Sequence, residues 1–423
     1  MTSADQPEPA WILSAAKWIT LDRVRAQAAI LAICLWGVCA VDFATPGFFD
    51  RAGNIKFQDF LPLFVSAQLI AHGQATRLYN QQGTTEAVSV VIPGPIRVRL
   101  PNLYGPQVGL FFVPLTRFSF PAAARIWATA SIFIFAFCVY LVWRCCPGLH
   151  LHPGTVFLCA IAFPPLFHFF VRGQTSAAVL GCFTAAFLAF RTDRQFLAGV
   201  ALGFLVFKPQ FVVAMPLVFL LSQSWKPFAG LVLSAGAQVV FARIYFGPVV
   251  MRAYFDTLLH ISRSIRGVEL SLAPIQMHSL RAFWTLVVPA PTWALALYLL
   301  SSIVVVAIAA AIWKSSAPLA LRFSALVLAA VLANPHLFVY DLLVAAPVLL
   351  LLIDWSLTQL QPVSSSTLRL LLYLAYLLPL LGPISQWTHL QLSVLDFAAL
   401  LWLLRRYSRM SLRPFASNES AIV

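Results

Sequence analysis

Charged residues are scarce in this sequence of 423 amino acids. Asp, Glu, Lys and Arg together make up 10% of it, whereas 61% of the residues are hydrophobic. A soluble domain carries about a quarter charged residues, because water must solvate its surface. The composition therefore excludes an ordinary soluble protein and predicts a chain largely embedded in a lipid bilayer.

Acidic residues are especially rare, with 14 Asp and Glu against 28 Lys and Arg, so the formal net charge is +14. The basic residues punctuate apolar runs instead of gathering in one polar domain, and this distribution favours membrane lipids over nucleic acid as partners. No acidic pair is spaced as D-x-D, and the seven cysteines contain no C-x-x-C pair. The sequence thus offers neither a metal-binding motif nor a disulfide framework.

Long apolar runs are abundant. Ten of them approach membrane-spanning length, at about residues 26–44, 122–143, 153–170, 174–190, 228–246, 292–313, 317–333, 340–353, 367–383 and 390–404. We therefore predict an all-α, polytopic transmembrane protein with about ten full spans. Basic residues in the short connections all fall on the inner side if the N-terminus is cytoplasmic, so both termini are predicted to be cytoplasmic.

One stretch departs from this pattern. Phe196–Phe207 and Phe211–Leu221 are each too short to cross about 30 Å, and Lys208-Pro209-Gln210 separates them. Basic residues flank the stretch on both sides. We predict a pair of half-helices that enter from the cytoplasmic face and meet inside the protein.

Two long segments, residues 45–121 and 247–290, are predicted to face outward. Long connections of this kind are uncommon unless they are functional. In the first segment, Phe60–Ala71 repeats apolar residues at helical spacing, which predicts an amphipathic helix on the membrane surface. The sequence from Tyr104 to Leu115 predicts a short re-entrant element before the second span.

The exit of the first span and the outward loop directly after it contain Asp42, Asp50 and Asp59. Any one of them could be an ordinary solvated carboxylate. Asp59 differs from the others because it lies beside Phe57 and Phe60 at the start of an apolar helix. Partial desolvation there would raise its basicity.

Four further polar groups interrupt apolar sequence. Lys208 is expected at membrane depth, where a cation faces a partner or a water-filled cavity, or else extends to an interface. A cation with free backbone groups at a half-helix turn could receive a phosphate. The other groups are Arg172-Gly173-Gln174-Thr175, Gln276–Arg281, and Asn334-Pro335-His336 with Tyr340-Asp341. Each could be a turn or a helix cap, but all are predicted on one side of the membrane.

Short motifs follow one another in a fixed order over about residues 55–350. They are Gln58-Asp59-Phe60 with Gly73 and Leu78-Tyr79, Tyr104-Gly105-Pro106 and Pro114-Leu115, Ala123-Ala124 with Trp127, Gly173-Gln174, Ala198-Gly199 leading to Lys208-Pro209-Gln210, Ser279-Leu280, and Pro335-His336 with Tyr340-Asp341. In this order the chain resembles glycosyltransferase family 87, a polytopic family of the GT-C fold group that includes bacterial polyprenol-phosphate-mannose-dependent mannosyltransferases. Beyond Asp354 the resemblance is limited to hydrophobicity.

The resemblance implies a GT-C-like fold with an active-site cavity at the outer membrane face. The expected divisions are a cytoplasmic segment 1–25, a catalytic membrane module 26–354, C-terminal transmembrane helices 355–404 and a basic cytoplasmic tail 405–423. In such enzymes an acidic residue of the first outer loop is the general base, and the sugar leaves an isoprenoid phosphate with inversion. Asp59 occupies that position, and Asp42 is the reserve candidate.

The departing phosphate needs positive charge and hydrogen-bond donors, and polar residues at predicted membrane depth and at the family's motif positions could supply them. The expected donor-phosphate ligands are Lys208, His336, Arg172 and Arg281, and the expected substrate-binding residues are Tyr104, Gln174, Gln210, Gln276, Tyr340 and Asp341. A lipid monophosphate has little need of a metal, so no metal and no cofactor is expected. The expected partners are a polyprenyl-phosphate sugar and a lipid or glycan acceptor in a bacterial cytoplasmic membrane. A transporter or flippase of a lipid-linked sugar is the alternative, because broken helices also mark carriers.

Overall fold

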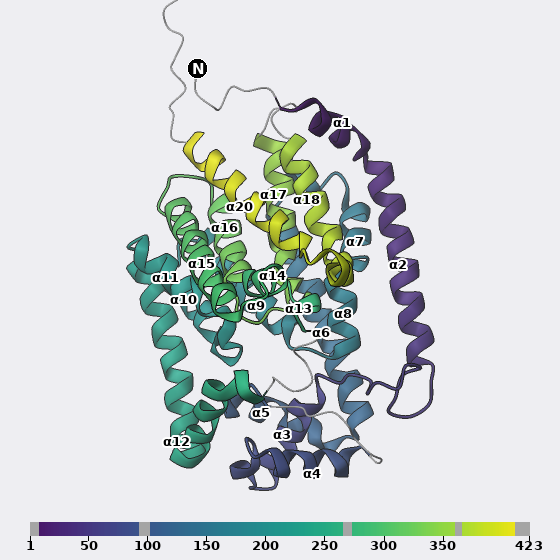
Figure 1. The fold of residues 1–423 in the computed structure, drawn as a ribbon, viewed down its shortest axis with the longest axis vertical. Coiled ribbons are helices and arrows are strands. Elements are labelled where there is room, and N and C mark those ends of the chain that lie inside the picture. The colour runs from purple at the N-terminus through teal and green to yellow at the C-terminus, as the bar shows by residue number, and fades with distance from the viewer. Residues whose placement is uncertain (1–7, 93–101, 265–272, 360–365, 411–423) are drawn as a thin grey trace, which may run out of the picture.

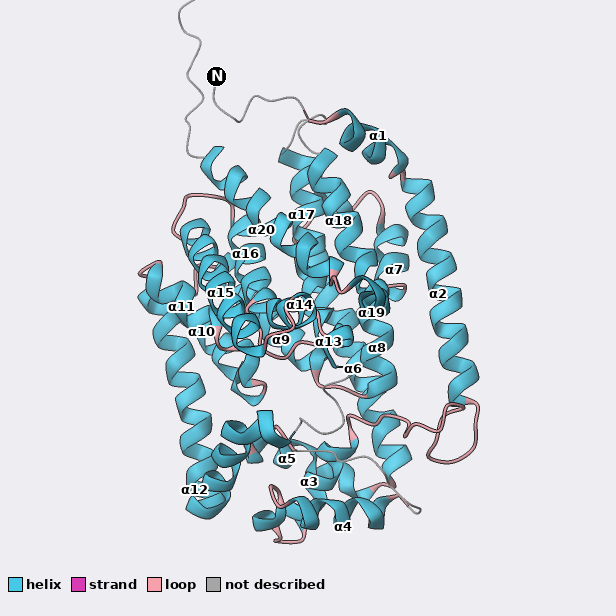
Figure 2. Ribbon diagram, in the orientation of Figure 1, coloured by secondary structure: helices cyan, strands magenta, loops and turns pink. Residues whose placement is uncertain are grey.

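The computed structural model describes residues 8–92, 102–264, 273–359 and 366–410, and these are helical with no β-strand among them (Figure 2). Two isolated β-bridges, Phe49 with Ile55 and Met277 with Phe338, are present. The all-α prediction is confirmed. Residues 411–423 of the predicted basic tail lie outside the described residues.

Six helices in the described part of the chain are long and apolar enough to cross a membrane. They are α2 (Leu21–Phe43), α6 (Phe120–Trp143), α12 (Trp225–Ser264), α15 (Pro291–Trp313), η6 with α17 (Val339–Val344 and Ala345–Gln359), and α18 with η8 and α19 (Ser366–Leu377, Leu378–Ile384 and Ser385–Thr388). The pair α7 (Pro153–Ile161) and α8 (Pro164–Arg172) forms a seventh span if its 44° bend is allowed. The chain is a polytopic helical membrane protein (Figure 1).

Full-length spans are fewer than the ten apolar runs predicted. The runs at 174–190 and 317–333 form α9 (Ser176–Arg191) and α16 (Leu319–Leu332), of 16 and 14 residues, which are shorter than the roughly 20 residues that cross a bilayer. The run at 390–404 lies in α20 (Leu392–Met410), whose last turns are basic. Eleven of the fourteen residues of α16 are buried, so other helices and not lipid surround it. An apolar run predicts a helix but does not tell these two surroundings apart.

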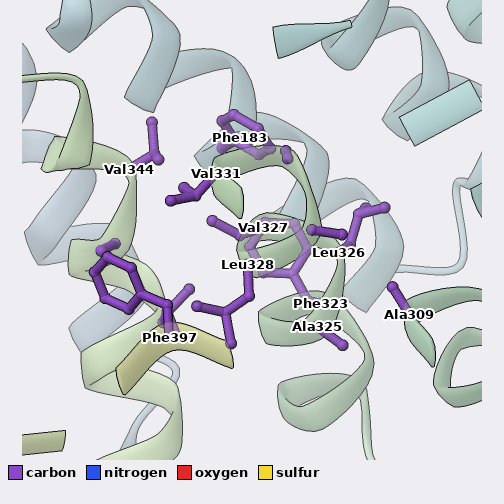
Figure 3. Close-up of a cluster of buried hydrophobic side chains, with 14 of the residues drawn as sticks. Phe183, Ala309, Phe323, Ala325, Leu326, Val327, Leu328, Val331, Val344 and Phe397 are labelled. Carbon is purple, nitrogen blue, oxygen red and sulfur yellow. The ribbon is translucent and has the colours of Figure 1, made fainter. Parts of the chain in front are cut away.

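The core is centred on α16, from which Phe323, Leu326 and Val327 are fully buried (Figure 3). Phe183 of α9 and Phe397 of α20 pack around them. Because lipid tails are as apolar as these side chains, close van der Waals packing holds such a core together, with little drive from hydrophobicity. The C-terminal helices α18 and α20 therefore belong to the same bundle as the helices before them.

The predicted half-helices are present. The first is α10 with η4 (Gln195–Gly203 and Phe204–Phe207), the second is η5 with α11 (Pro209–Phe211 and Ala214–Leu221), and Lys208 joins them. A Cβ atom on Gly199 would lie 2.0 Å from the carbonyl oxygen of Pro227, and one on Gly203 would lie 2.4 Å from that of Leu231. The first half therefore runs along the start of α12 in the same direction, and the second half returns.

Replacing Gly230 by Ala tests this close packing. The new Cβ would lie 2.2 Å from the carbonyl oxygen of Phe196, a backbone atom that cannot rotate away. We expect the free energy of unfolding to fall by about 1–3 kcal/mol, the usual cost of overpacking, seen as a lower midpoint temperature in detergent. Gly236→Ala on the same helix is the control, since nothing lies within 4 Å of its Cβ position. Equal midpoints for the two variants would contradict the close contact of α10 with α12.

A layer of short helices covers one end of the bundle, drawn at the bottom of Figure 1. It contains α3 (Leu61–Ala71), η1 (Ala75–Arg77), α4 (Gln81–Val91), α5 (Pro106–Phe112) and η2 (Val113–Arg117). The distal part of α12 reaches this layer after a kink at Gly247, where φ is +78°. The short element predicted from Tyr104 to Leu115 corresponds to α5 and the start of η2.

Helix α3 forms where it was predicted, but it does not lie on the surface. Seven of its eleven residues are buried, because α4, α5 and η2 pack around it. The amphipathic surface helix of this layer is instead α4, which buries Gly83 and Val88 on one face and exposes polar side chains such as Glu86. The prediction for α3 was wrong because its polar positions are few and neighbouring helices cover it, so it has no face that contacts solvent.

The remaining short helices lie at the periphery of the bundle or between its spans. They are α1 (Ala10–Trp18), η3 (Pro147–Leu149), α13 (Ala273–Gln276) and α14 (Leu280–Val287). Helix α1 packs against α18, and α14 packs against α15. The first of these contacts lies at the end of the bundle opposite to α3 and α4 (Figure 1).

Candidate functional site

The turn between α8 and α9 is the centre of the polar site. Gly173 ends α8 with a φ of +70°, a conformation that a residue with a side chain rarely adopts. The indole Nε1 of Trp127 donates to the carbonyl oxygens of Gly173 and Gln174, at 3.2 and 3.3 Å. This anchors the turn and places Gln174, Thr175 and Ser176 in succession at the start of α9.

Asp59 is attached to this turn by its backbone and its side chain. Its backbone N–H donates to the carbonyl oxygen of Arg172 at 3.0 Å, and its Oδ2 accepts from Nε2 of Gln174 at 2.7 Å. The hydroxyl of Tyr104 donates to Oε1 of the same glutamine at 3.0 Å. The structure therefore brings four predicted site residues together, two from the layer of short helices and two from the end of α8 and the turn after it.

The carboxyl group of Asp59 has an altered basicity. Burial raises its pKa above the ordinary value, while the guanidinium of Arg172 and the hydrogen bond from Gln174 act in the opposite direction without cancelling the rise. The residue is nevertheless half-buried, so it is not sealed from solvent. A reachable carboxylate with raised basicity is the arrangement that a general base requires.

Lys208 and Asp341 form a salt bridge inside the protein, although 133 residues separate them. Lys208 is 4% exposed and Asp341 is 1% exposed. The hydroxyl of Ser176 donates to Oδ1 of Asp341 at 2.7 Å, and Nζ of Lys208 lies 3.4 Å from that hydroxyl. Nζ also lies 5.5 Å from the ring centroid of Tyr340. Lys208 thus faces a partner and does not extend to an interface.

These two polar groups share the α8–α9 turn, since Gln174 belongs to the first and Ser176 to the second. The sequence predicted Lys208 and Asp341 as separate ligands and missed their pairing, as well as Ser176. A signal was present, because opposite charges at membrane depth usually pair. Gln58 was also missed as a ligand, and its Oε1 accepts from Nη1 of Arg172 at 3.3 Å.

His336 lies next to this site in the connection from α16 to η6. Its backbone N–H donates to Oδ1 of Asn334 at 2.9 Å, and its ring meets that of Phe338 edge-on at 4.8 Å. Burial lowers the pKa of His336 to about 4, so the imidazole is neutral at pH 7 and offers hydrogen bonds instead of charge. Nη1 of the exposed Arg281 reaches the carbonyl oxygen of Pro335 at 3.5 Å.

Three predicted site residues are not part of these groups. Asp42 lies near the end of α2, Gln210 lies half-buried in η5, and Gln276 is exposed at the end of α13. Within the described residues, none of the three donates or accepts a side-chain hydrogen bond to the residues around Asp59 or Lys208. Gln276 is close in the chain to Met277, which pairs with Phe338 beside His336.

A bundle of apolar helices, with a polar site between its layer of short helices and its broken helix, defines a polytopic membrane protein with a buried polar site. The family model for glycosyltransferase family 87 matches residues 102–345, which is more than half of the chain. The chain belongs to glycosyltransferase family 87 and is a membrane glycosyltransferase. No curated protein matches the sequence, and no solved structure does so. The matched range includes Gln174, Lys208 and Asp341, whereas Asp59 precedes it.

Proposed function

We propose that this glycosyltransferase moves a hexosyl residue, mannosyl by family expectation, from a polyprenyl phosphate to a lipid or glycan acceptor. Asp59 is the general base in this proposal. The observation that carries it is the half-buried Asp59 carboxylate, which has raised basicity and accepts from Gln174, while the backbone N–H of Asp59 donates to the carbonyl oxygen of Arg172. Asp42 stays the reserve candidate and has less support, because it lies apart from this group.

The chemistry is an in-line displacement. Asp59 takes the proton of an acceptor hydroxyl as its oxygen bonds to the anomeric carbon, while the bond from that carbon to the phosphate oxygen breaks on the opposite face. A single displacement inverts the anomeric configuration. The base increases the nucleophilicity of the hydroxyl, and donors around the phosphate stabilise the charge that it gains.

Four residues are proposed to bind the donor phosphate. Arg172 and Arg281 supply full positive charge, and His336 supplies a neutral N–H group. Lys208 has its charge balanced by Asp341, but an ammonium group has three N–H donors and the pair with Ser176 uses two. Lys208 can therefore contribute one hydrogen bond while it orients the broken helix.

Six residues are proposed to line the substrate site. They are Tyr104, Gln174, Gln210, Gln276, Tyr340 and Asp341. Tyr104, Gln174 and Asp341 also hold the charged groups in place, as their hydrogen bonds show. We further propose that the site opens to the outer face of a bacterial cytoplasmic membrane and that both termini are cytoplasmic.

We expect the reaction to be independent of metal ions. A lipid monophosphate carries less charge than a diphosphate, and no group of three or more His, Cys, Asp or Glu residues suited to a metal occurs in the part of the chain that the structure describes. Dialysis against EDTA should leave the rate of sugar transfer unchanged. A large loss of rate that magnesium or manganese restores would contradict this expectation.

The class of donor tests the proposal. Purified protein in detergent is given the same radiolabelled hexose on a polyprenyl monophosphate, on a polyprenyl diphosphate and on a nucleotide. We expect transfer from the polyprenyl monophosphate alone. Equal transfer from a nucleotide sugar would contradict the lipid-linked donor and leave the family assignment intact.

A further inference from the structure

Tyr79 lies outside the residues assigned above, yet it is bonded to one of them. It follows η1 in the layer of short helices, and its hydroxyl donates to the carbonyl oxygen of Tyr104 at 2.7 Å. Burial, together with the neighbouring Tyr254, raises the pKa of Tyr79, so the phenol stays protonated and able to donate. Tyr79 therefore holds the backbone of a residue whose own hydroxyl reaches the base network.

Tyr104 is held at three points. Its N–H donates to Oδ1 of Asn102 at 3.2 Å, and the amide of Asn102 donates to Ser66 of α3 at 3.0 Å. Its carbonyl oxygen accepts from Tyr79, and its hydroxyl donates to Gln174. A phenol hydroxyl lies several bonds from its own backbone, so a small rotation of that backbone moves the hydroxyl out of hydrogen-bonding range of Gln174.

The orientation of the Gln174 amide decides whether Asp59 faces its N–H donor or its carbonyl oxygen. Oε1 of Gln174 accepts from the hydroxyl of Tyr104 at 3.0 Å and from the N–H of Thr175 at 3.3 Å. These two donors direct the amide nitrogen at the Asp59 carboxylate. With the hydroxyl of Tyr104 withdrawn, Oε1 keeps only the longer bond from the N–H of Thr175, so the amide nitrogen is held less firmly at the Asp59 carboxylate.

A second contact supports Tyr79 from outside. Its ring packs against that of Tyr254, with centroids 5.5 Å apart. Tyr254 lies on the part of α12 beyond the kink at Gly247 and is buried with Met251. The distal part of α12 thus fixes the ring of Tyr79, while its hydroxyl fixes Tyr104.

We propose that Tyr79 is a positioning residue for the general base, acting through the carbonyl of Tyr104 and the amide of Gln174. This rests on the proposed function, because it takes Asp59 as the base. Tyr79 touches neither substrate in this account. It contributes by keeping one hydrogen-bond donor aimed at the Asp59 carboxylate.

The test is Tyr79→Phe, which keeps the packed ring and removes one hydroxyl. The expected kcat is about 3- to 10-fold lower with little change in the KM for the donor, the effect of one neutral hydrogen bond. Because the bond from Gln174 lowers the pKa of Asp59, weakening that bond should raise the pKa and move the acid limb of the pH–rate profile to higher pH. Tyr254→Phe is the matched control, since it removes a hydroxyl from the same pair of rings without touching Tyr104, and we expect the profile of the wild type.

If Tyr79→Phe does not give the expected result, two further variants, Tyr104→Phe and Asp59→Asn, show which of the two proposals has failed. A shifted acid limb in Tyr104→Phe with an unchanged limb and kcat in Tyr79→Phe would overturn the role of Tyr79 alone. Full activity in Asp59→Asn would overturn the proposed base and, with it, any role of Tyr79 in positioning it. A shift of equal size in Tyr254→Phe would also overturn the proposal, because a general loosening of the layer of short helices would then explain the shifts in both variants.

Discussion

Asp59→Asn is expected to lower kcat by about 10²- to 10⁴-fold, the usual contribution of a general base. Asn keeps the shape of Asp and an oxygen that accepts from Gln174, so the variant should fold and bind both substrates with little change in KM. The measurement is the initial rate of transfer at saturating donor and acceptor, with the elution profile and unfolding midpoint as checks on folding.

Asp42→Asn is the matched control, because this residue is another Asp close by in the chain, near the end of α2, and lies outside the hydrogen-bonded group. It should retain the activity of the wild type. A loss confined to Asp42→Asn would transfer the role of base to the reserve candidate and contradict the assignment to Asp59.

The same assignment fixes the direction of the pH dependence. A general base works in its deprotonated form, and burial raises the pKa of Asp59 above the ordinary value of a carboxyl group. The rate should therefore fall as the pH is lowered through this raised pKa, at a higher pH than a solvated aspartate would give. An acid limb in the ordinary range of a solvated carboxyl would contradict the desolvation of Asp59.

The second large effect is expected at the buried ion pair. Lys208→Met or Asp341→Asn leaves one charge without a partner, and breaking a buried pair usually costs about 3–5 kcal/mol. The free energy of unfolding should fall by about this amount in each single variant, measured as a lower unfolding midpoint and a lower yield in detergent.

The double variant Lys208→Met/Asp341→Asn separates stability from chemistry. Removing both charges should recover much of the stability lost in the single variants, since no uncompensated charge remains. If Lys208 also binds the donor phosphate, the double variant should transfer sugar more slowly than the wild type even though its stability has recovered. Additive losses of stability would contradict the coupling of the two residues, and full activity of the double variant would contradict the phosphate role.

The broken helix was predictable because its cause is local. Two apolar stretches too short to cross a bilayer, separated by a proline and a lysine, are legible from the sequence, and the structure shows the break at Lys208. The burial of α3 and of α16 among other helices was not predictable in the same way. Those features depend on which neighbours surround a helix, and an apolar run looks alike in lipid and in protein.

The sequence identified most residues of the candidate site but not the hydrogen bonds and the ion pair that join them. Asp59, Tyr104, Arg172 and Gln174 were each identified from the sequence, and they meet in space. The pairing of Lys208 with Asp341 joins residues far apart in the chain, and no local pattern encodes such a contact. Tyr79 was part of a motif, but its bond to a backbone carbonyl has no signature in the sequence.

We propose that this chain breaks the bond between a sugar and a polyprenyl phosphate. The most direct measurement incubates the purified protein in detergent with polyprenyl-phosphate-[14C]mannose and an acceptor, and follows both products. We expect one polyprenyl phosphate to be released for each sugar transferred, with the anomeric configuration inverted. Label that stays on polyprenyl phosphate for every sugar and acceptor offered, but crosses the bilayer when the protein is placed in vesicles, would contradict it and favour a carrier.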